Sequence, residues 1–131
     1  MRLAKQTLIG LVASLAFISA APVLATAQKP YDQKSFDAAQ AAGKPVLVEI
    51  HADWCPTCKA QLPILNKLSG EGAYAPIERY RVDFDSQKDL VKRFGAKMQS
   101  TLVLYRGKTE LARSTGETDE GRIRAMLDKA K

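Results

Sequence analysis

Apolar residues along residues 28–131 occur in two patterns, which predict alternating strands and helices. Continuous apolar runs indicate central strands that are covered on both faces, whereas apolar spacings of three and four residues indicate helices that bury one face. The expected strands cover residues 46–51, 80–84, 101–105 and 110–114. The expected helices cover residues 31–44, 56–68 and 87–94, and a last helix begins near Asp119.

Residue types that start and stop helices support these boundaries. We expect Ser35 to cap the first helix and Gly43 to end it. Asp85 or Ser86 is expected to cap the third helix, and Gly95 to end it. The resulting order α-β-α-β-α-β-β-α predicts an α/β fold, in which a central mixed β-sheet is flanked by helices on both faces.

Residues 1–27 differ in composition from the rest of the chain. Arg2 and Lys5 give a basic start, and the remainder carries no charge and ends in Ala-Thr-Ala. This order is typical of a secretory signal peptide, cleaved here before Gln28. The alternative is an uncleaved membrane anchor, because an uncharged stretch of about 20 residues can cross a bilayer. With either a signal peptide or an anchor, the single domain of residues 28–131 is exported. We expect it in a bacterial periplasm, where disulfides can form.

The charge distribution does not favour a nucleic-acid partner. The chain has a formal net charge of +6, but the basic residues are dispersed, and Lys92-Arg93 is the only adjacent basic pair. A nucleic-acid footprint would gather the positive charge on one stripe. The charge is better explained as a solubilising surface.

Two cysteines, Cys55 and Cys58, lie between a predicted strand and a predicted helix and have no other cysteine to pair with. A structural zinc site needs four ligands, and the chain adds only His51 to the two thiols. A c-type haem needs histidine after the second cysteine, where Lys59 stands. A purely structural disulfide is an alternative, although closing so small a ring adds little stability. The pattern therefore favours a redox-active dithiol.

The placement of the two thiols suggests their roles. At the amino end of a helix, free N–H groups and the helix dipole lower the pKa of Cys55 and make it the nucleophile. Pro56 suits the first helical turn, because no hydrogen bond is needed from it there. Cys58, one turn further and more buried, resolves the mixed disulfide. Trp54 shields one side of the pair and offers an apolar contact to a client, the alternative being simple packing.

Glu49 is a carboxyl group inside an otherwise apolar strand, which is costly unless the group is paired or protonated. One interpretation makes it a buried proton acceptor behind Cys58, with a raised pKa. The other makes it an exposed carboxylate at the strand end, paired with Lys59 or Arg81. His51 is expected to be an ordinary packing residue, because nothing in the sequence places a second titrating group beside it.

These residues resemble the thioredoxin superfamily. Residues 52–59 are similar to its active-site signature, and Pro63 matches the proline that kinks its active-site helix. Glu49 falls where thioredoxins carry a buried acid, residues 82–85 match the next central strand, and Gly116 matches a glycine before the last helix. The resemblance implies a thioredoxin-like three-layer fold and a protein disulfide oxidoreductase that needs no cofactor and no metal.

Finer resemblances suggest a direction for the reaction. The Cys-Pro-Thr-Cys loop is similar to that of membrane-tethered thioredoxins serving cytochrome c maturation. The Ala-Asp-Trp-Cys segment that leads into this loop is similar to the corresponding segment in the carboxy-terminal domain of the transmembrane disulfide reductase. Both relatives are periplasmic reductants. The resemblance therefore implies a monomer that reduces protein disulfides and receives electrons from a membrane or periplasmic donor.

Ser100 departs from the family pattern, because it stands where thioredoxins carry a cis-proline. A non-proline cis bond costs about 2.5–4 kcal/mol, so the peptide between Gln99 and Ser100 is expected to be trans. In the family this loop faces the cysteines, binds the substrate backbone and keeps metal ions off the dithiol. The residues expected to contact substrate are Trp54, Pro56, Thr57, Gln99 and Ser100.

Two other functions stay open, the first of them because of this departure. One is a metal or iron–sulfur cluster-binding protein, in which a dimer shares the metal through two Cys55/Cys58 pairs. The other is a non-catalytic module that holds clients on the thioredoxin surface, with the cysteines incidental.

Overall fold

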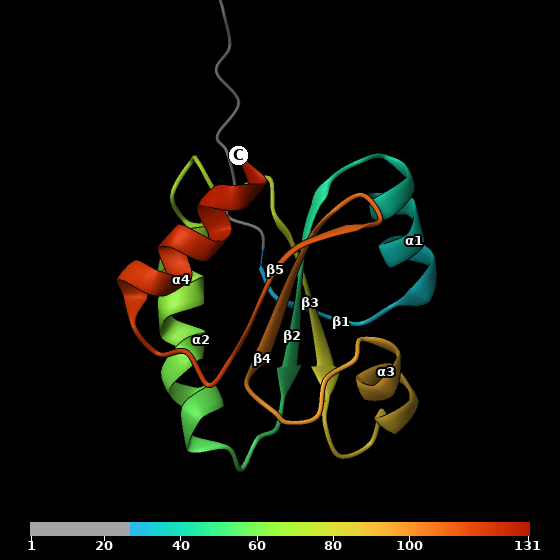
Figure 1. Cartoon of the computed structure of the whole chain (residues 1–131), viewed down its shortest axis with the longest axis vertical. Helices are drawn as coiled ribbons and strands as arrows, with labels where there is room; N and C mark the ends of the chain where they lie inside the picture. Colours follow the sequence, from blue (N-terminus) through green and yellow to red (C-terminus); the bar gives the residue numbers. More distant parts are fainter. Residues whose placement is uncertain (1–26) are drawn as a thin grey trace, which may run out of the picture.

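The chain folds as alternating strands and helices, and the computed structural model describes residues 27–131 (Figure 1). The strands are β1 (Lys29–Pro30), β2 (Pro45–His51), β3 (Glu78–Asp83), β4 (Thr101–Arg106) and β5 (Thr109–Thr115). The helices are α1 (Gln33–Ala41), α2 (Pro56–Ser69), α3 (Lys88–Arg93), α4 (Glu120–Leu127) and the short 3₁₀ helix η1 (Asp128–Ala130). None of the helices in the described residues is long and apolar enough to span a bilayer. The predicted signal peptide falls on residues 1–27 and so lies, but for its last residue, outside the described part.

The five strands form one mixed sheet in the order β1-β3-β2-β4-β5. β1, β3 and β2 run parallel, whereas β4 is antiparallel to both β2 and β5. The mixed sheet with helices on both faces is confirmed. β1 was not predicted, because a strand of two residues shows no apolar period.

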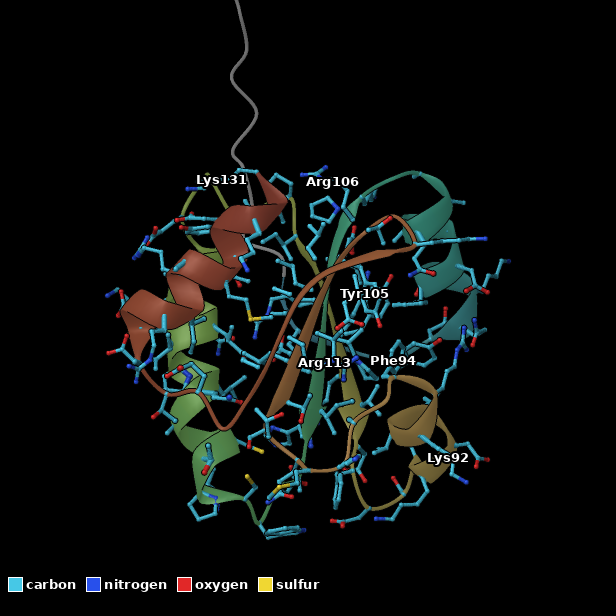
Figure 2. The ribbon with its side chains drawn as sticks, in the orientation of Figure 1. Lys92, Phe94, Tyr105, Arg106, Arg113 and Lys131 are labelled. Atoms are coloured by element: carbon cyan, nitrogen blue, oxygen red, sulfur yellow. The ribbon has the colours of Figure 1, made fainter. Side chains whose placement is uncertain are left out.

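β2 lies at the centre of the sheet and sends side chains into both halves of the core. Val46, Val48 and Ile50 pack on one side, under α1 and α3, where Figure 2 shows Phe94 and Tyr105 close together. Leu47 alternates to the other side, under α2 and α4. A strand covered on both faces explains the continuous apolar run that marks this segment in the sequence.

Two of the predicted helix caps are wrong. Asp32, not Ser35, caps α1, and its carboxylate accepts the Ser35 N–H at 2.8 Å. Neither Asp85 nor Ser86 caps α3, because both N–H groups turn back to the Asp83 carboxylate. At α1 the ionised Asp32 carboxylate is a stronger acceptor than the Ser35 hydroxyl. At α3 the N-cap position is taken by Gln87, which makes no side-chain capping bond.

The topology brings distant segments to one edge of the sheet. The register of β2 and β4 pairs Ile50 with Thr101, so β4 begins where β2 ends. The register of β4 and β5 pairs Thr101 with Thr115, so the loop after β5 reaches the same edge. The segment that joins β2 to α2, which carries the cysteines, therefore lies beside the loops that precede β4 and follow β5.

Candidate active site

Cys55 stands immediately before α2, at its amino end. Its backbone is extended, with φ −80° and ψ 114°, and the helix begins at Pro56, which has no N–H to leave unpaired. The Cys55 sulfur accepts the backbone N–H of Cys58 at 3.1 Å. That N–H and the helix dipole stabilise negative charge on the sulfur. Cys55 is therefore placed to act as a thiolate nucleophile.

Both cysteines are free thiols, and both are buried. The exposed fraction is 1% for Cys55 and 2% for Cys58. The two thiols form a small apolar cluster with Ala52, against which the half-buried Phe84 packs. The prediction that Cys58 is the more buried of the two is wrong, because the same cluster covers Cys55 as well.

Cys58 is held as a neutral thiol at neutral pH. Burial first, and then the hydrogen bond to the Cys55 sulfur, raise the pKa of Cys58 to about 11. The backbone of Ala52 and of Ser100 acts in the opposite direction and lowers the pKa of Cys58 in part. Cys58 must therefore lose its proton before its sulfur can attack a disulfide.

Two large apolar side chains are exposed on the loops around the dithiol. Trp54 is 56% exposed and Met98 is 54% exposed, and they are the exposed large hydrophobic residues of the described chain. The Trp54 indole Nε1 donates to the Asp85 carboxylate at 2.7 Å, which fixes the ring. Beside Trp54, Pro56 is exposed and Thr57 half-buried. Exposed aromatic and thioether side chains next to a reactive group are typical of a binding surface.

The loop before β4 contains the residue that departs from the family pattern. The peptide between Gln99 and Ser100 is trans, as predicted, and Ser100 is buried with φ +57°. The Ser100 N–H donates to the Ile50 carbonyl at 2.8 Å, and the Ser100 carbonyl accepts the Gly116 N–H at 3.0 Å. Ser100 therefore has both backbone groups bonded within the chain. Among the described residues the half-buried Gln99 finds no acceptor for its backbone N–H.

Glu49 is buried and paired, but its partner is neither of the two that the sequence suggested. Arg79 donates to both of its carboxylate oxygens, at 2.6 and 3.1 Å, and the Gln28 side-chain amide donates to one of them. Arg79 is 2% exposed and also donates to Asn66 and Ser69 of α2. The interpretation of Glu49 as an exposed carboxylate paired with Lys59 or Arg81 is therefore wrong.

Comparison with known proteins assigns the chain to a family. The family model described as Thioredoxin matches residues 27–129. The chain belongs to the thioredoxin family. It is 32% identical over 84 residues to a thioredoxin of Chlamydia muridarum, a match that covers 64% of this chain and 80% of that protein. It is also 39% identical over 71 residues to the protein disulfide-isomerase erp38 of Neurospora crassa, covering 53% of this chain and 19% of the isomerase.

A solved structure agrees with this assignment. The crystal structure of Trxlp from Edwardsiella tarda EIB202 has a TM-score of 0.75 and 42% sequence identity, and the match covers 77% of this chain and 98% of Trxlp. Thioredoxin relatives and a dithiol at a helix amino end identify the chain as a thiol–disulfide oxidoreductase.

In this thioredoxin-family chain, His51 has a titrating neighbour that the sequence did not reveal. The buried His51 Nε2 lies 3.3 Å from the carboxylate of Asp53, which also accepts Arg81 Nη2 at 2.6 Å. The hydrogen bond from Arg81, and then its charge, lower the pKa of Asp53. The sequence placed no titrating group beside His51, whereas the structure places Asp53 there, two residues after the end of β2.

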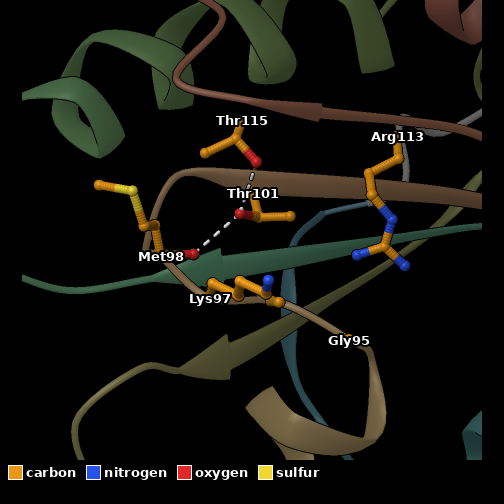
Figure 3. Close-up of a pocket in the computed structure, with 7 residues that line it drawn as sticks. Gly95, Lys97, Met98, Thr101, Arg113 and Thr115 are labelled. Carbon is orange, nitrogen blue, oxygen red and sulfur yellow. Dashed lines mark hydrogen bonds between the residues drawn. The ribbon is translucent and has the colours of Figure 1, made fainter.

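A pocket of about 200 Å³ adjoins the loop before β4 (Figure 3). The lining includes two basic side chains and no acidic one, and its residues are Gly95, Ala96, Lys97, Met98, Thr101, Arg113 and Thr115. Thr101 donates to the Met98 carbonyl and meets the Thr115 hydroxyl, as the dashed lines in Figure 3 show. Arg113 is bound on one side by Glu110, whereas Lys97 has no ion-pair partner within residues 27–131. The pocket is therefore basic and lies next to the exposed Met98.

The metal-binding alternative gains no support from the family or from the side chains. In the part of the chain that the structure describes, no group of three or more His, Cys, Asp or Glu residues could hold a metal ion. The reported relatives are a thioredoxin, a protein disulfide-isomerase and Trxlp. Neither the metal-binding nor the non-catalytic alternative is supported.

Proposed function

We propose that this chain is an exported thioredoxin-family enzyme that reduces disulfides in protein clients. The observation that carries the proposal is the pairing of Cys55 and Cys58, in which one sulfur accepts an N–H at a helix start and the other remains a buried thiol. An asymmetric pair of this kind has one thiol for attack and one for resolution.

The reaction transfers two electrons from the dithiol to the client. The Cys55 thiolate attacks one client sulfur, so that a mixed disulfide forms and the other client sulfur leaves as a thiolate. Cys58 then loses its proton and attacks Cys55, which forms the Cys55–Cys58 disulfide and releases the second client sulfur. Both client sulfurs end as thiols, and a separate donor must return two electrons to the dithiol.

We propose Glu49 as the group that takes up the proton of Cys58. Glu49 lies in β2 on the face covered by α2, the helix that contains Cys58, and Arg79 fixes its carboxylate from the neighbouring strand. A buried carboxylate held in one orientation is suited to proton transfer, because its reorganisation on reaction is small.

Clients are proposed to dock on the surface formed by Trp54 and Met98. The Gln99 N–H offers the client backbone one hydrogen bond, as expected for this loop. Beyond Met98, the basic pocket is complementary to an acidic client side chain, because Lys97 at its rim has no carboxylate partner among the described residues. We therefore propose that clients with Asp or Glu near the reacting cysteine are preferred.

The proposals of export and of reduction rest on the sequence. Arg2, Lys5 and the uncharged stretch up to Ala27 support a signal peptide and a periplasmic location. Edman or mass analysis of the exported protein should find Gln28 as the first residue. Recovery of the full-length chain in the membrane fraction would instead indicate an anchor.

Insulin reduction by dithiothreitol tests the activity. The purified protein should accelerate precipitation of the insulin B chain, and Cys55→Ser should abolish the acceleration. Cys58→Ser should instead accumulate a mixed disulfide with the client, because attack survives and resolution does not. A wild-type rate no higher than that of Cys55→Ser would refute the proposal.

The direction of electron flow is tested by alkylation of the two thiols in intact cells. A reduced Cys55/Cys58 pair in the periplasm would support a reductant that is supplied by a membrane or periplasmic donor. Because that compartment is itself oxidising, the pair stays reduced only if a donor keeps it so. An oxidised pair would instead favour an oxidase or a stable disulfide.

A further inference from the structure

Met98 carries a thioether that is open to solvent at the docking surface. Its exposed fraction is 54%, against 7% for Met126, the other methionine within residues 27–131. Met126 lies in α4 against the core, and its sulfur accepts the Ser114 hydroxyl at 3.5 Å. Exposure governs how readily a sulfur meets a dissolved oxidant. The described part of the chain therefore has one accessible and one protected methionine.

The backbone of the loop that carries Met98 is held from several sides. The Met98 carbonyl accepts the Thr101 hydroxyl at 2.8 Å (Figure 3). From α2, the buried side chain of Gln61 donates to the Ser100 carbonyl at 3.1 Å and to the Glu117 carbonyl at 2.8 Å. These bonds attach the loop before β4 and the loop after β5 to the helix of the dithiol. None of them involves the Met98 side chain, so a chemical change of that side chain leaves the loop in place beside the dithiol.

An accessible thioether undergoes two-electron oxidation by peroxides. The sulfur lone pair attacks one oxygen of hydrogen peroxide, so that an S–O bond forms, the O–O bond breaks and water leaves. The sulfur loses two electrons, and the peroxide gains them. The product, methionine sulfoxide, is polar and chiral, whereas the thioether is apolar and flexible. Methionine sulfoxide reductases return the sulfoxide to the thioether, so the change is reversible.

We propose that Met98 is an oxidation site: peroxide converts its thioether to the sulfoxide, and the polar product lowers the affinity of the docking surface for protein clients. This inference rests on the oxidoreductase function proposed above, because Met98 acts through contact with the client and not through the thiols.

The physical basis is the different cost of covering the two forms of the side chain. An unbranched, polarizable thioether adapts to apolar surfaces of different shape, which suits a surface that meets many clients. A sulfoxide must give up its hydration when a client covers it, and burial of a polar group without a partner is costly. Reduction of client disulfides should therefore decline after oxidation of Met98, while the chemistry of the dithiol stays intact.

Mass analysis after peroxide treatment tests whether Met98 is the reactive methionine. The dithiol is first oxidised to the disulfide, so that peroxide meets no thiol. Trypsin places the two methionines in separate peptides, residues 98–106 and 125–129. In the native protein Met98 should gain oxygen at least about tenfold faster than Met126, and the two rates should become equal in urea, where burial no longer differs. Equal rates in the native protein would overturn the proposal.

Two disulfide substrates distinguish the docking surface from the dithiol, once dithiothreitol has reduced the disulfide again. The first is Ellman's reagent, a small disulfide: attack by Cys55 releases one thionitrobenzoate, and resolution by Cys58 releases a second. Oxidation of Met98 should change neither release. The second is a disulfide-linked peptide with an apolar residue beside the reacting cysteine, for which kcat/KM should fall by about three- to tenfold, as expected for the loss of one apolar contact. An equal fall for both substrates would mean damage to the dithiol and would contradict the proposal.

Met98→Leu and Met126→Leu are the matched variants, because each removes one methionine sulfur and keeps an apolar side chain of similar size. Each variant is compared with itself before and after peroxide. Met98→Leu should lose none of its activity toward the peptide, whereas Met126→Leu should lose as much as wild type.

Methionine sulfoxide reductases, one for each sulfoxide epimer, should restore the activity that wild type has lost. A loss of the same size in Met98→Leu, or full peptide activity in wild type with Met98 oxidised, would overturn the proposal. If untreated wild type reduces neither Ellman's reagent nor the peptide, the proposed function fails instead.

Discussion

Arg79 donates to both carboxylate oxygens of Glu49, through Nε at 2.6 Å and Nη2 at 3.1 Å, and both side chains are almost fully buried. The two charges come from neighbouring strands, β2 and β3, and lie beneath the helix of the dithiol. Burying this pair makes two large and opposite contributions to the free energy of folding. Each charged group loses its hydration, and the attraction and hydrogen bonds between the two groups offset that cost.

Loss of one partner should therefore be more damaging than loss of both. Arg79→Met should lower the free energy of unfolding by about 3–5 kcal/mol, because Glu49 is left as an unpaired buried charge. Glu49→Leu combined with Arg79→Met should cost less than Arg79→Met alone. Urea denaturation of the reduced proteins measures both values. A double variant at least as unstable as Arg79→Met alone would contradict this account.

The proposed proton transfer makes a separate prediction for Glu49. Glu49→Gln keeps the volume and one acceptor but removes the proton-accepting group. Release of the second thionitrobenzoate from Ellman's reagent should slow by on the order of tenfold to a hundredfold, with the first release little changed. Glu49→Asp retains the carboxyl group and should lose less. Equal rates for Glu49→Gln and wild type would remove Glu49 from the mechanism.

The central part of this fold could be predicted from the sequence because its signals are local. The continuous apolar run of β2 marks a strand buried on both faces, and the spacing of Cys55 and Cys58 after it marks the dithiol. Both signals lie within a few residues of one another. The burial of Cys55 could not be predicted, because Phe84, which packs against the same thiol cluster, follows a different strand.

The partner of Glu49 shows why the rest was out of reach. The predicted strand began at Tyr80, which left Arg79 outside the sheet, whereas β3 begins at Glu78. Within the longer strand, Arg79 alternates to the same face as Arg81 and reaches Glu49 on the neighbouring strand β2. A shift of two residues in one boundary therefore concealed the main electrostatic contact of the core. Gln61 was missed for a similar reason, since its two acceptors follow it by 39 and 56 residues.

The raised pKa of Cys58 predicts how stability depends on pH. In the folded chain the thiol keeps its proton up to about pH 11, whereas its ordinary pKa is 9.0. Between these values the unfolded chain binds fewer protons, so the stability of the reduced protein falls as the pH rises through this window. The loss should approach about 2–3 kcal/mol relative to Cys58→Ala, which lacks the thiol. Parallel stability curves for the two proteins from pH 8 to about 11 would contradict the shift.

Client preference should depend on Lys97. Two disulfide-linked peptides that differ only in Asp or Lys beside the reacting cysteine provide the probe. Lys97→Glu should lower kcat/KM for the acidic peptide by about two- to fivefold and raise it for the basic one, because an exposed charge pair contributes this much. Lys108→Glu changes the net charge equally, but Lys108 lies in the exposed turn between β4 and β5, at the other end of both strands from Thr101 and Thr115. This variant should leave kcat/KM unchanged for both peptides. The effect of Lys97→Glu should also fade with added salt, since screening weakens exposed pairs. A shift of the same size in Lys108→Glu would mean that overall charge, not the pocket beside Met98, selects the client.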